Sequence, residues 1–170
     1  MKQPAWHCYR VCLYWLNISG SNCGKGILIR KAKVSDVKAI NHLRLQVREN
    51  ALSDPGLVTE DMTRDAITRL GRGWVFEESG AILGFSIALE ESRSIWALFV
   101  LPEQEGRGIG HQLLEAAVNW LWSRGVENIT LGTDPGTRAE KFYRDRGWRA
   151  AGIRENGEIL FELVSPESEN

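Results

Sequence analysis

The chain has 170 residues, a formal net charge of −1, 43% hydrophobic residues and 25% charged residues. These values are typical of one globular domain with a core of its own, and the near-neutral charge argues against a nucleic-acid-binding face. The longest apolar run, Val11–Ile18, includes Asn17 and falls well short of the about 20 residues that span a bilayer. We therefore expect neither nucleic acid nor a membrane as a partner, and a cytoplasmic location.

Residues 1–26 have the composition of a flexible N-terminal extension, which ends in a segment rich in glycine and serine. The potential metal ligands of this extension are His7, Cys8, Cys12 and Cys23. Their spacing matches no standard zinc-finger pattern, so we expect no bound metal. Because every cysteine lies before residue 24, the single domain expected over residues 27–170 has no cysteine nucleophile.

The domain begins with a short apolar strand, Ile27–Arg30, and two amphipathic helices. Ser35 or Asp36 caps the first helix. Its apolar residues recur at helical spacing, at Val37, Ile40, Leu43 and Val47. Thr59 begins the second helix, and Gly71 is expected to stop it.

The rest of the domain alternates strands and helices. Three consecutive strands are expected at Trp74–Glu77, Ile82–Leu89 and Ile95–Leu101. The last of them is almost entirely apolar, which predicts burial on both faces. A glycine-rich loop then leads into a long helix that Gly125 closes.

The C-terminal part follows the same rules. It comprises a strand at Val126–Thr133, a helix from Thr137 to Gly147, and a hairpin of strands at Trp148–Ile153 and Glu158–Val164. Thr137 and Glu140 form a capping box at the start of that helix. The element order predicts a mixed α/β (α+β) fold, in which helices flank both faces of one central, mixed and mostly antiparallel sheet.

The glycine-rich loop, Glu105–Gly110, joins a strand directly to a helix. The start of a helix offers unpaired N–H groups and a partial positive charge, and glycines let a ligand approach the backbone closely. With Arg107 as an added cation, this pattern predicts a site for a phosphate or pyrophosphate. A tight turn without a ligand is the simpler alternative. A dinucleotide-binding loop is disfavoured, because it would need glycine or alanine at His111.

Two segments resemble the GNAT superfamily of N-acetyltransferases. The segment Leu98–Pro102, followed by Glu105–Leu114, resembles the family's coenzyme-binding motif, whose loop reads Arg/Gln-x-x-Gly-x-Gly/Ala. The segment Ala139–Trp148 resembles the family's Ala-x-x-Phe-Tyr-x-x-x-Gly-Phe motif. The two occur in the family's order and at its spacing, and the resemblance covers residues 27–164. It departs from the family's pattern at Glu105, which replaces Arg or Gln, and at Gly136, which replaces Asn.

The resemblance implies a GNAT-like acyl-CoA N-acyltransferase fold, with acetyl-CoA as co-substrate and no metal. The residues that it places against the coenzyme are Leu98, Phe99, Val100, Gly106, Arg107, Gly108, Ile109, Gly110 and His111. One or two of the cations near the second motif would face the coenzyme's remaining phosphate, from among Arg138, Lys141, Arg144 and Arg146. Tyr143 matches the general acid that protonates the departing thiolate, although it could also be a core aromatic residue.

The base that accepts the amine's proton has no clear candidate among the histidines. Glu90 and Glu91 follow the strand expected at Ile82–Leu89 and are the carboxylates nearest to the expected site. The simpler alternative is that both belong to a solvated turn beside Arg93. Tryptophans that could suggest a nucleic-acid stacking surface are expected in the core instead, at Trp96, Trp120, Trp122 and Trp148.

The resemblance implies direct acetyl transfer to a primary amine of a small molecule or a protein, within a ternary complex. The family's usual acceptor wall corresponds to the loop Asn50–Leu57. A non-catalytic acyl-CoA-binding or regulatory module is the main alternative, and a zinc-clustered interaction module on residues 1–26 is a third. The sequence leaves a homodimer open.

Overall fold

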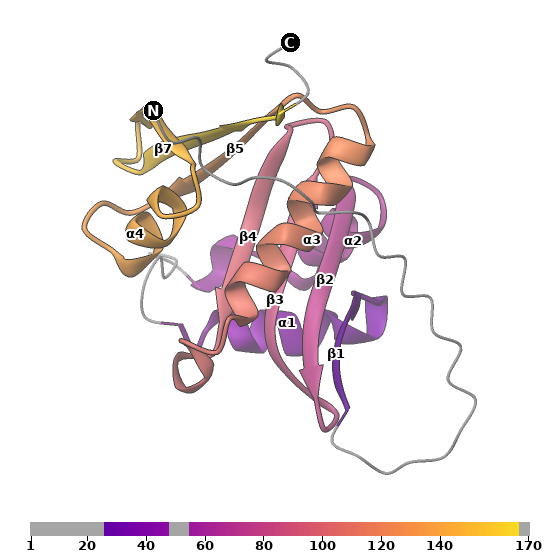
Figure 1. The fold of residues 1–170 in the computed structure, drawn as a ribbon. Helices are drawn as coiled ribbons and strands as arrows, with labels where there is room; N and C mark the ends of the chain where they lie inside the picture. Colours follow the sequence, from indigo (N-terminus) through magenta and orange to yellow (C-terminus); the bar gives the residue numbers. More distant parts are fainter. Residues whose placement is uncertain (1–25, 48–54, 167–170) are drawn as a thin grey trace.

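The structure is a computed structural model, in which residues 26–47 and 55–166 are described. Within these residues, seven strands form one sheet in the order β1-β2-β3-β4-β5-β7-β6 (Figure 1). Every neighbouring pair is antiparallel except β4 and β5, which are parallel. The predicted mixed, mostly antiparallel sheet is therefore confirmed. The cysteines and His7 lie outside the described residues.

The strands are β1 (Ile27–Lys31), β2 (Gly71–Glu78), β3 (Ala81–Leu89), β4 (Ser94–Val100), β5 (Asn128–Thr133), β6 (Arg149–Ile153) and β7 (Ile159–Val164). The α-helices are α1 (Val37–Arg44), α2 (Glu60–Thr68), α3 (Ile109–Ser123) and α4 (Arg138–Arg144). Short 3-10 turns occupy Val34–Asp36, Pro55–Leu57 and Pro102–Gln104. The element order agrees with the sequence prediction, and most ends differ from it by one to three residues.

The structure differs from the sequence prediction at the end of α1 and at Gly71. Helix α1 ends at Arg44, so that Val47 lies beyond the helix rather than on its apolar stripe. Gly71 was expected to stop α2, but it is the first residue of β2. A side chain at Gly71 would collide with the backbone carbonyl of Ala88 on β3, so the glycine is required by the sheet.

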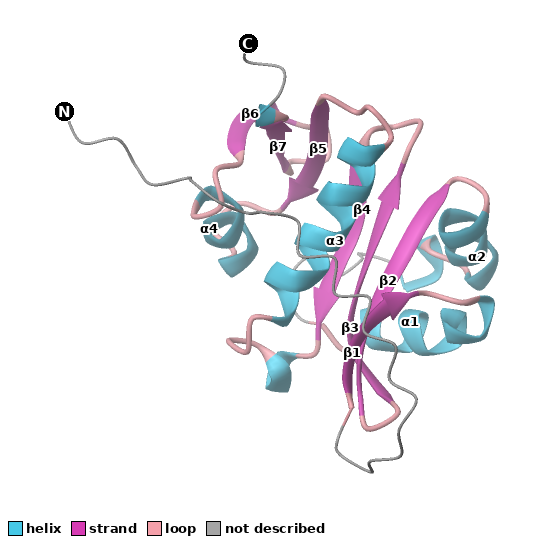
Figure 2. Cartoon of the chain, turned by 45° about the vertical axis from the view of Figure 1, so that its right-hand side comes forward, coloured by secondary structure: helices cyan, strands magenta, loops and turns pink. Residues whose placement is uncertain are grey.

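The helices form layers on both faces of the sheet. Helix α3 lies along one face, and α1 and α2 cover the opposite face (Figure 2). On the α1 side, Ile40 and Ile67 are buried in one apolar cluster with Phe85. On the α3 side, Leu121 and Ile129 are buried in a second cluster. The core thus consists of two apolar layers separated by the sheet.

The sheet opens between β4 and β5. These strands share one register pair, Ser94 with Thr130, and the Thr130 N–H donates to the Arg93 carbonyl at 2.9 Å. Beyond that point each strand pairs only with its other neighbour, β4 with β3 and β5 with β7. The edge of β4 that faces β5 therefore has backbone groups without a strand partner.

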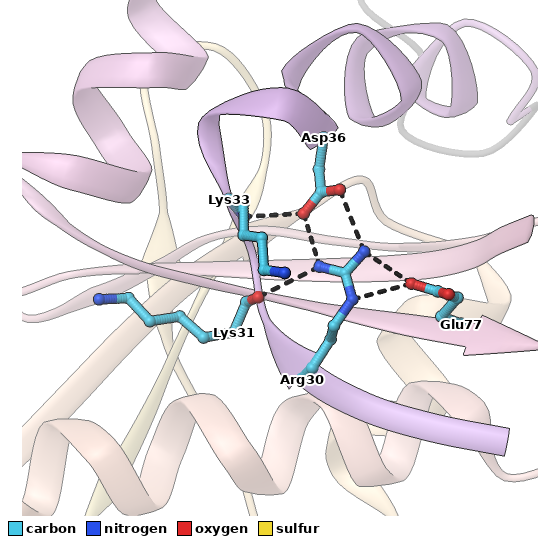
Figure 3. A network of polar contacts seen from close by, with 5 residues as sticks. All are labelled: Arg30, Lys31, Lys33, Asp36 and Glu77. Carbon is cyan, nitrogen blue, oxygen red and sulfur yellow. Dashed lines mark hydrogen bonds and ion pairs between the residues drawn. The ribbon is translucent and has the colours of Figure 1, made fainter. Parts of the chain in front are cut away.

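A partly buried ion-pair network fixes the start of the domain (Figure 3). The Arg30 guanidinium donates to Asp36 Oδ2 at 2.6 Å and to Glu77 Oε2 at 2.8 Å. The Lys33 backbone N–H also donates to Asp36, at 2.7 Å. These contacts join β1, the turn before α1, and β2. The hydrogen bond from Arg30 lowers the pKa of Asp36, and the Lys33 N–H acts in the same direction.

Asp36→Asn should lower the free energy of unfolding by about 2–4 kcal/mol, because it leaves Arg30 partly buried beside a neutral amide. The folded pKa of Asp36 lies below its ordinary value of 3.8. Its stabilisation is therefore present above that pH and is lost as the pH falls through the folded pKa. Urea denaturation of both proteins should show the difference shrinking below about pH 4.

Asp145→Asn is the matched control for this test. Asp145 pairs with Lys141 at 2.8 Å, but both side chains are more than half exposed. Removing an exposed pair should cost less than about 1 kcal/mol. Equal losses in the two variants would contradict a structural role for the Arg30–Asp36 pair.

Candidate active site

A first cavity of about 640 Å³ lies between the end of β4 and the beginnings of α3 and α4. Most of the residues that the sequence predicts as coenzyme-binding line it, namely Leu98, Phe99, Val100, Gly106, Gly108, Ile109, Gly110 and His111. Tyr143 lines it as well. Arg107 is the one predicted residue that is not in its lining. The structure thus brings both sequence motifs to one cavity.

The glycine loop presents unpaired backbone N–H groups to this cavity. Gly106 and Gly108 have positive φ angles of 75° and 78°, which favour glycine. Gly108 is the N-cap of α3, and within the described residues no hydrogen bond is made by the backbone N–H groups of residues 106–108. The first N–H groups of α3 have no intrahelical partner either. Together they form an anion-binding geometry at the start of a 15-residue helix.

The side chain of Arg107 points away from this geometry. Its Nη2 atom contacts Glu78 Oε1 at 2.8 Å, and its Nη1 atom donates to Gln104. The cation that the sequence assigned to the loop is therefore paired with a carboxylate of β2. Arg107 can contribute its backbone to a ligand, but the structure does not place its charge in the cavity.

Other charged side chains occupy the cavity wall. Glu105, the departure from the family's motif, forms an ion pair with Arg138, so its negative charge is compensated. Arg146 stacks on Phe142, with its guanidinium carbon 3.7 Å from the ring centroid. Its Nε atom is 3.4 Å from Nδ1 of His111. Of the four cations expected near the second motif, Arg138 and Arg146 line the cavity.

The other two cations of this group form ion pairs on the surface. Lys141 pairs with Asp145, and Arg144 pairs with Glu140. Glu140 also accepts a hydrogen bond from the Gly136 N–H at 2.8 Å, and its own N–H donates to Thr137 at 3.2 Å. Half of the expected capping box is therefore present, because the Glu140 carboxylate accepts from the Gly136 N–H rather than from that of Thr137.

Tyr143 of α4 lines the first cavity and belongs to the core. Its ring is 6% exposed and packs against Phe142, Trp148 and Phe161. Within the described residues its hydroxyl makes no hydrogen bond. Burial raises the pKa of the Tyr143 phenol above its ordinary value of 10, so the group stays protonated at neutral pH. The arrangement provides a fixed proton donor that has no protein acceptor.

A second cavity of about 260 Å³ is lined by residues of α1, β4 and β5. It shares three lining residues with the first, Leu98, Phe99 and Tyr143. The two cavities therefore share part of one wall, which β4 and Tyr143 form. Of the acceptor wall expected at Asn50–Leu57, residues 50–54 lie outside the described residues, and the adjoining Val58 lines this second cavity.

The sequence did not single out the charged residues of the second cavity. These are Arg44, Arg154 and Glu158. Arg44 reads in the sequence as the polar end of a helix, and the other two as part of a surface hairpin. Trp96, which was expected in the core, also lines this cavity. Strand β4 thus contributes to the walls of both cavities. Its residues from Leu98 to Val100 are only partly buried, although the apolar sequence predicted burial on both faces.

The expected base candidates lie elsewhere. Glu90 accepts a hydrogen bond from Arg124 at 2.9 Å, beyond the C-terminal end of α3. That helix has 15 residues, which corresponds to about 22 Å between its ends. Neither Glu90 nor Glu91 lines either cavity. The carboxylate that lines the second cavity is that of Glu158, which is paired with Arg154.

The acetyltransferase (GNAT) family model matches residues 39–148. The chain belongs to the acetyltransferase (GNAT) family. Over 94 residues it is 33% identical to the peptidyl-lysine N-acetyltransferase YiaC of Escherichia coli, a match that covers 52% of this chain and 62% of that relative. The chain thus spans less than two thirds of that relative's length.

Solved structures agree with this family in fold. An N-acetyltransferase from Staphylococcus aureus superposes with a TM-score of 0.69 and 22% identity, covering 82% of this chain and 98% of that chain. The protein yncA of Salmonella typhimurium, solved with its cofactor acetyl-CoA, gives a TM-score of 0.66 at 18% identity, covering 82% and 94% of the two chains. The GNAT-like fold predicted from the sequence is therefore confirmed.

Two further properties concern the described part of the chain alone. There, no three side chains among His, Cys, Asp and Glu are grouped so that they could hold a metal ion. None of the helices in residues 26–47 and 55–166 has the length and hydropathy of a membrane-spanning segment.

Proposed function

We propose that this protein transfers an acetyl group from acetyl-CoA to a primary amine while both substrates are bound. The observation that carries this proposal is that two cavities have Leu98, Phe99 and Tyr143 in common as wall residues. One cavity has an anion-binding loop and the other has none, so they suit two different substrates. The acetyl-CoA reported with the Salmonella neighbour supports the choice of coenzyme.

The first cavity fits acetyl-CoA in its chemistry. The N–H groups around Gly106–Gly110 would hold the pyrophosphate, because oriented backbone donors at a helix start favour negative charge. Arg146, which lines the same cavity and has no ion pair among the described residues, would face the remaining phosphate. The unpaired edge of β4 near Phe99 and Val100 would hydrogen-bond the amide groups of the pantetheine arm.

Bound acetyl-CoA supplies an acetyl group as a thioester, whose C–S bond breaks as the amine nitrogen forms the new N–C bond. Tyr143 holds a proton at its phenol oxygen and donates it to the departing sulfur. The amine must be neutral to attack, so the bound ammonium first loses one proton to solvent. After the attack the nitrogen again carries a positive charge, and its second proton restores the phenol. The phenolate takes this proton rather than the thiolate because an ordinary thiol has a pKa of about 8.5, below that of the phenol. Backbone N–H groups near Val100 polarise the carbonyl.

A non-catalytic module that only binds the coenzyme is the second candidate. It is favoured by one observation, that neither Glu90 nor Glu91 lies at the cavities. The buried phenol of Tyr143, without a protein partner, favours the enzyme. The acceptor amine belongs to a small molecule or a protein. The similarity to a peptidyl-lysine N-acetyltransferase is the reason to include protein lysines among the acceptors tested.

Tyr143→Phe separates these two candidates. The variant keeps the ring and its contacts with Phe142, Trp148 and Phe161, so the melting temperature and the acetyl-CoA affinity should hardly change. Loss of general acid catalysis should lower kcat by about 10²-fold in a thiol-release assay with the best amine found. A variant with the wild-type kcat would show that the proton comes from water. A wild-type protein that binds acetyl-CoA and acetylates no amine or peptide would support the module.

Gly108→Val tests the loop assignment. Valine is strained at a φ of 78°, so the variant should lose about 1–2 kcal/mol of stability and should reorient the N–H groups of the loop. Calorimetry should then show acetyl-CoA affinity reduced by at least about 10²-fold, since several charge-assisted hydrogen bonds are lost together.

Gly125→Val is the matched control for that substitution. Gly125 has the same φ of 78° and likewise has open space around its Cα, but it follows the opposite end of α3. The control should lose comparable stability and keep its acetyl-CoA affinity. If both variants bind equally well or equally poorly, the glycine loop is not the phosphate site.

A further inference from the structure

Arg44, the last residue of α1, is buried to a degree that is unusual for a cation. It is 8% exposed, and its enclosed Nε and Nη2 atoms have no hydrogen-bond partner. In the described residues no carboxylate pairs with its guanidinium. Burial lowers the pKa of Arg44 to about 10, which still leaves it charged at neutral pH. The fold thus keeps a positive charge in its interior without a counter-ion.

Three aromatic rings hold this guanidinium in place. Its central carbon lies 4.9 Å from the ring centroid of Trp96, 5.1 Å from that of Phe99 and 5.6 Å from that of Phe85. Cation–π stacking fixes the position of the group, but it takes none of its N–H donors. A buried cation whose donors are unused is costly, and a purely structural role would be met as well by an apolar side chain.

Arg44 lines the second cavity, and among the described charged residues of its lining it is the one without an ion-pair partner. The other charged lining residues, Arg154 and Glu158, pair with each other at 3.1 Å. Most of the remaining wall is apolar, including Val58, Trp96 and Leu131. One unpaired guanidinium in such surroundings favours a ligand with one negative charge, because both ions are poorly hydrated there.

We infer that the acceptor is a small amino carboxylic acid whose carboxylate binds Arg44 while its amine lies at Tyr143. This inference rests on the proposed acetyl transfer and specifies the substrate class of the same site. A carboxylate presents two oxygens side by side, which matches the planar donor pair of a guanidinium. A phosphate group would bring close to two negative charges at neutral pH, more than the single charge of Arg44 balances. The acceptor can be a free amino acid or a short peptide that ends near its amine.

The test compares acceptors that differ in charge at one group. The twenty amino acids, their carboxamides and glycine-extended dipeptides are assayed for thiol release from acetyl-CoA with three proteins: wild type, Arg44→Met and Arg72→Met. Methionine keeps the length of the side chain and removes the charge. Arg72 is the matched control, since its guanidinium also stacks on a ring, that of Trp120 at 5.3 Å, and it lines neither cavity.

Arg44→Met should lower kcat/KM for the best amino acid by about 10- to 100-fold and leave the value for its carboxamide unchanged. The amine of a carboxamide is less basic than that of the acid, so the comparison uses the change in the acid-to-amide ratio between proteins. That ratio should be unaltered in Arg72→Met. The melting temperature of Arg44→Met should stay near that of wild type, and Arg44→Lys serves as a second variant if it does not.

Calorimetry with the N-acetylated amino acids, in the presence of coenzyme A, gives a readout that does not need turnover. An affinity for the N-acetylated amino acid that is about 10- to 100-fold lower in Arg44→Met than in wild type would support the carboxylate site. If this difference is seen but no acceptor is acetylated, the carboxylate site stands and only the proposed acetyl transfer is refuted. Acetylation of amides or lysine peptides with an acid-to-amide ratio unchanged by Arg44→Met would overturn the carboxylate site and leave acetyl transfer standing. Dipeptides that replace free amino acids as the best acceptors would identify the peptide source of the carboxylate.

Discussion

The separation of two parallel strands is the constraint on which the candidate site depends. β4 and β5 meet at Ser94 and Thr130 and then part, because each continues along a different antiparallel neighbour. Backbone groups on the facing edges lose their ladder partners at this point, which is unfavourable unless water or a ligand replaces them. The opening therefore combines space with unused hydrogen-bonding capacity, and residues of β4 beside it line both cavities.

Apolar packing keeps the opening in a fixed shape. Helix α3 lies on β2, β3 and β4, and its Leu121 belongs to the same buried cluster as Ile129 of β5 and Phe161 of β7. One helix thus joins the two parts of the sheet that separate at β4 and β5. Tyr143 and Trp148 belong to that cluster as well, so the position of the phenol is set by the core. The stability of the core and the position of this phenol therefore depend on the same contacts.

Most of the charged side chains around the two cavities are paired with one another. Glu78 takes the charge of Arg107, and Arg138 compensates Glu105, so the loop itself offers mainly backbone donors. In the second cavity, pairing of Arg154 with Glu158 leaves Arg44 as the charge without a partner. Within the described residues, Arg44 and Arg146 are thus the cavity-lining cations that no carboxylate pairs with.

The sequence by itself determined the family, the order of the elements, the glycine loop and the place of Tyr143 in its motif. These depend on local properties, namely apolar periodicity, capping residues and the backbone freedom of glycine, which neighbouring residues express wherever the chain folds. The tertiary structure alone decided that Arg107 turns to Glu78, that Glu90 lies at the far end of α3, and that Arg44 stacks on Trp96. Side-chain partners of this kind follow from strand register and from the packing of helices on the sheet, which join residues far apart in the chain and leave no local signal in the sequence.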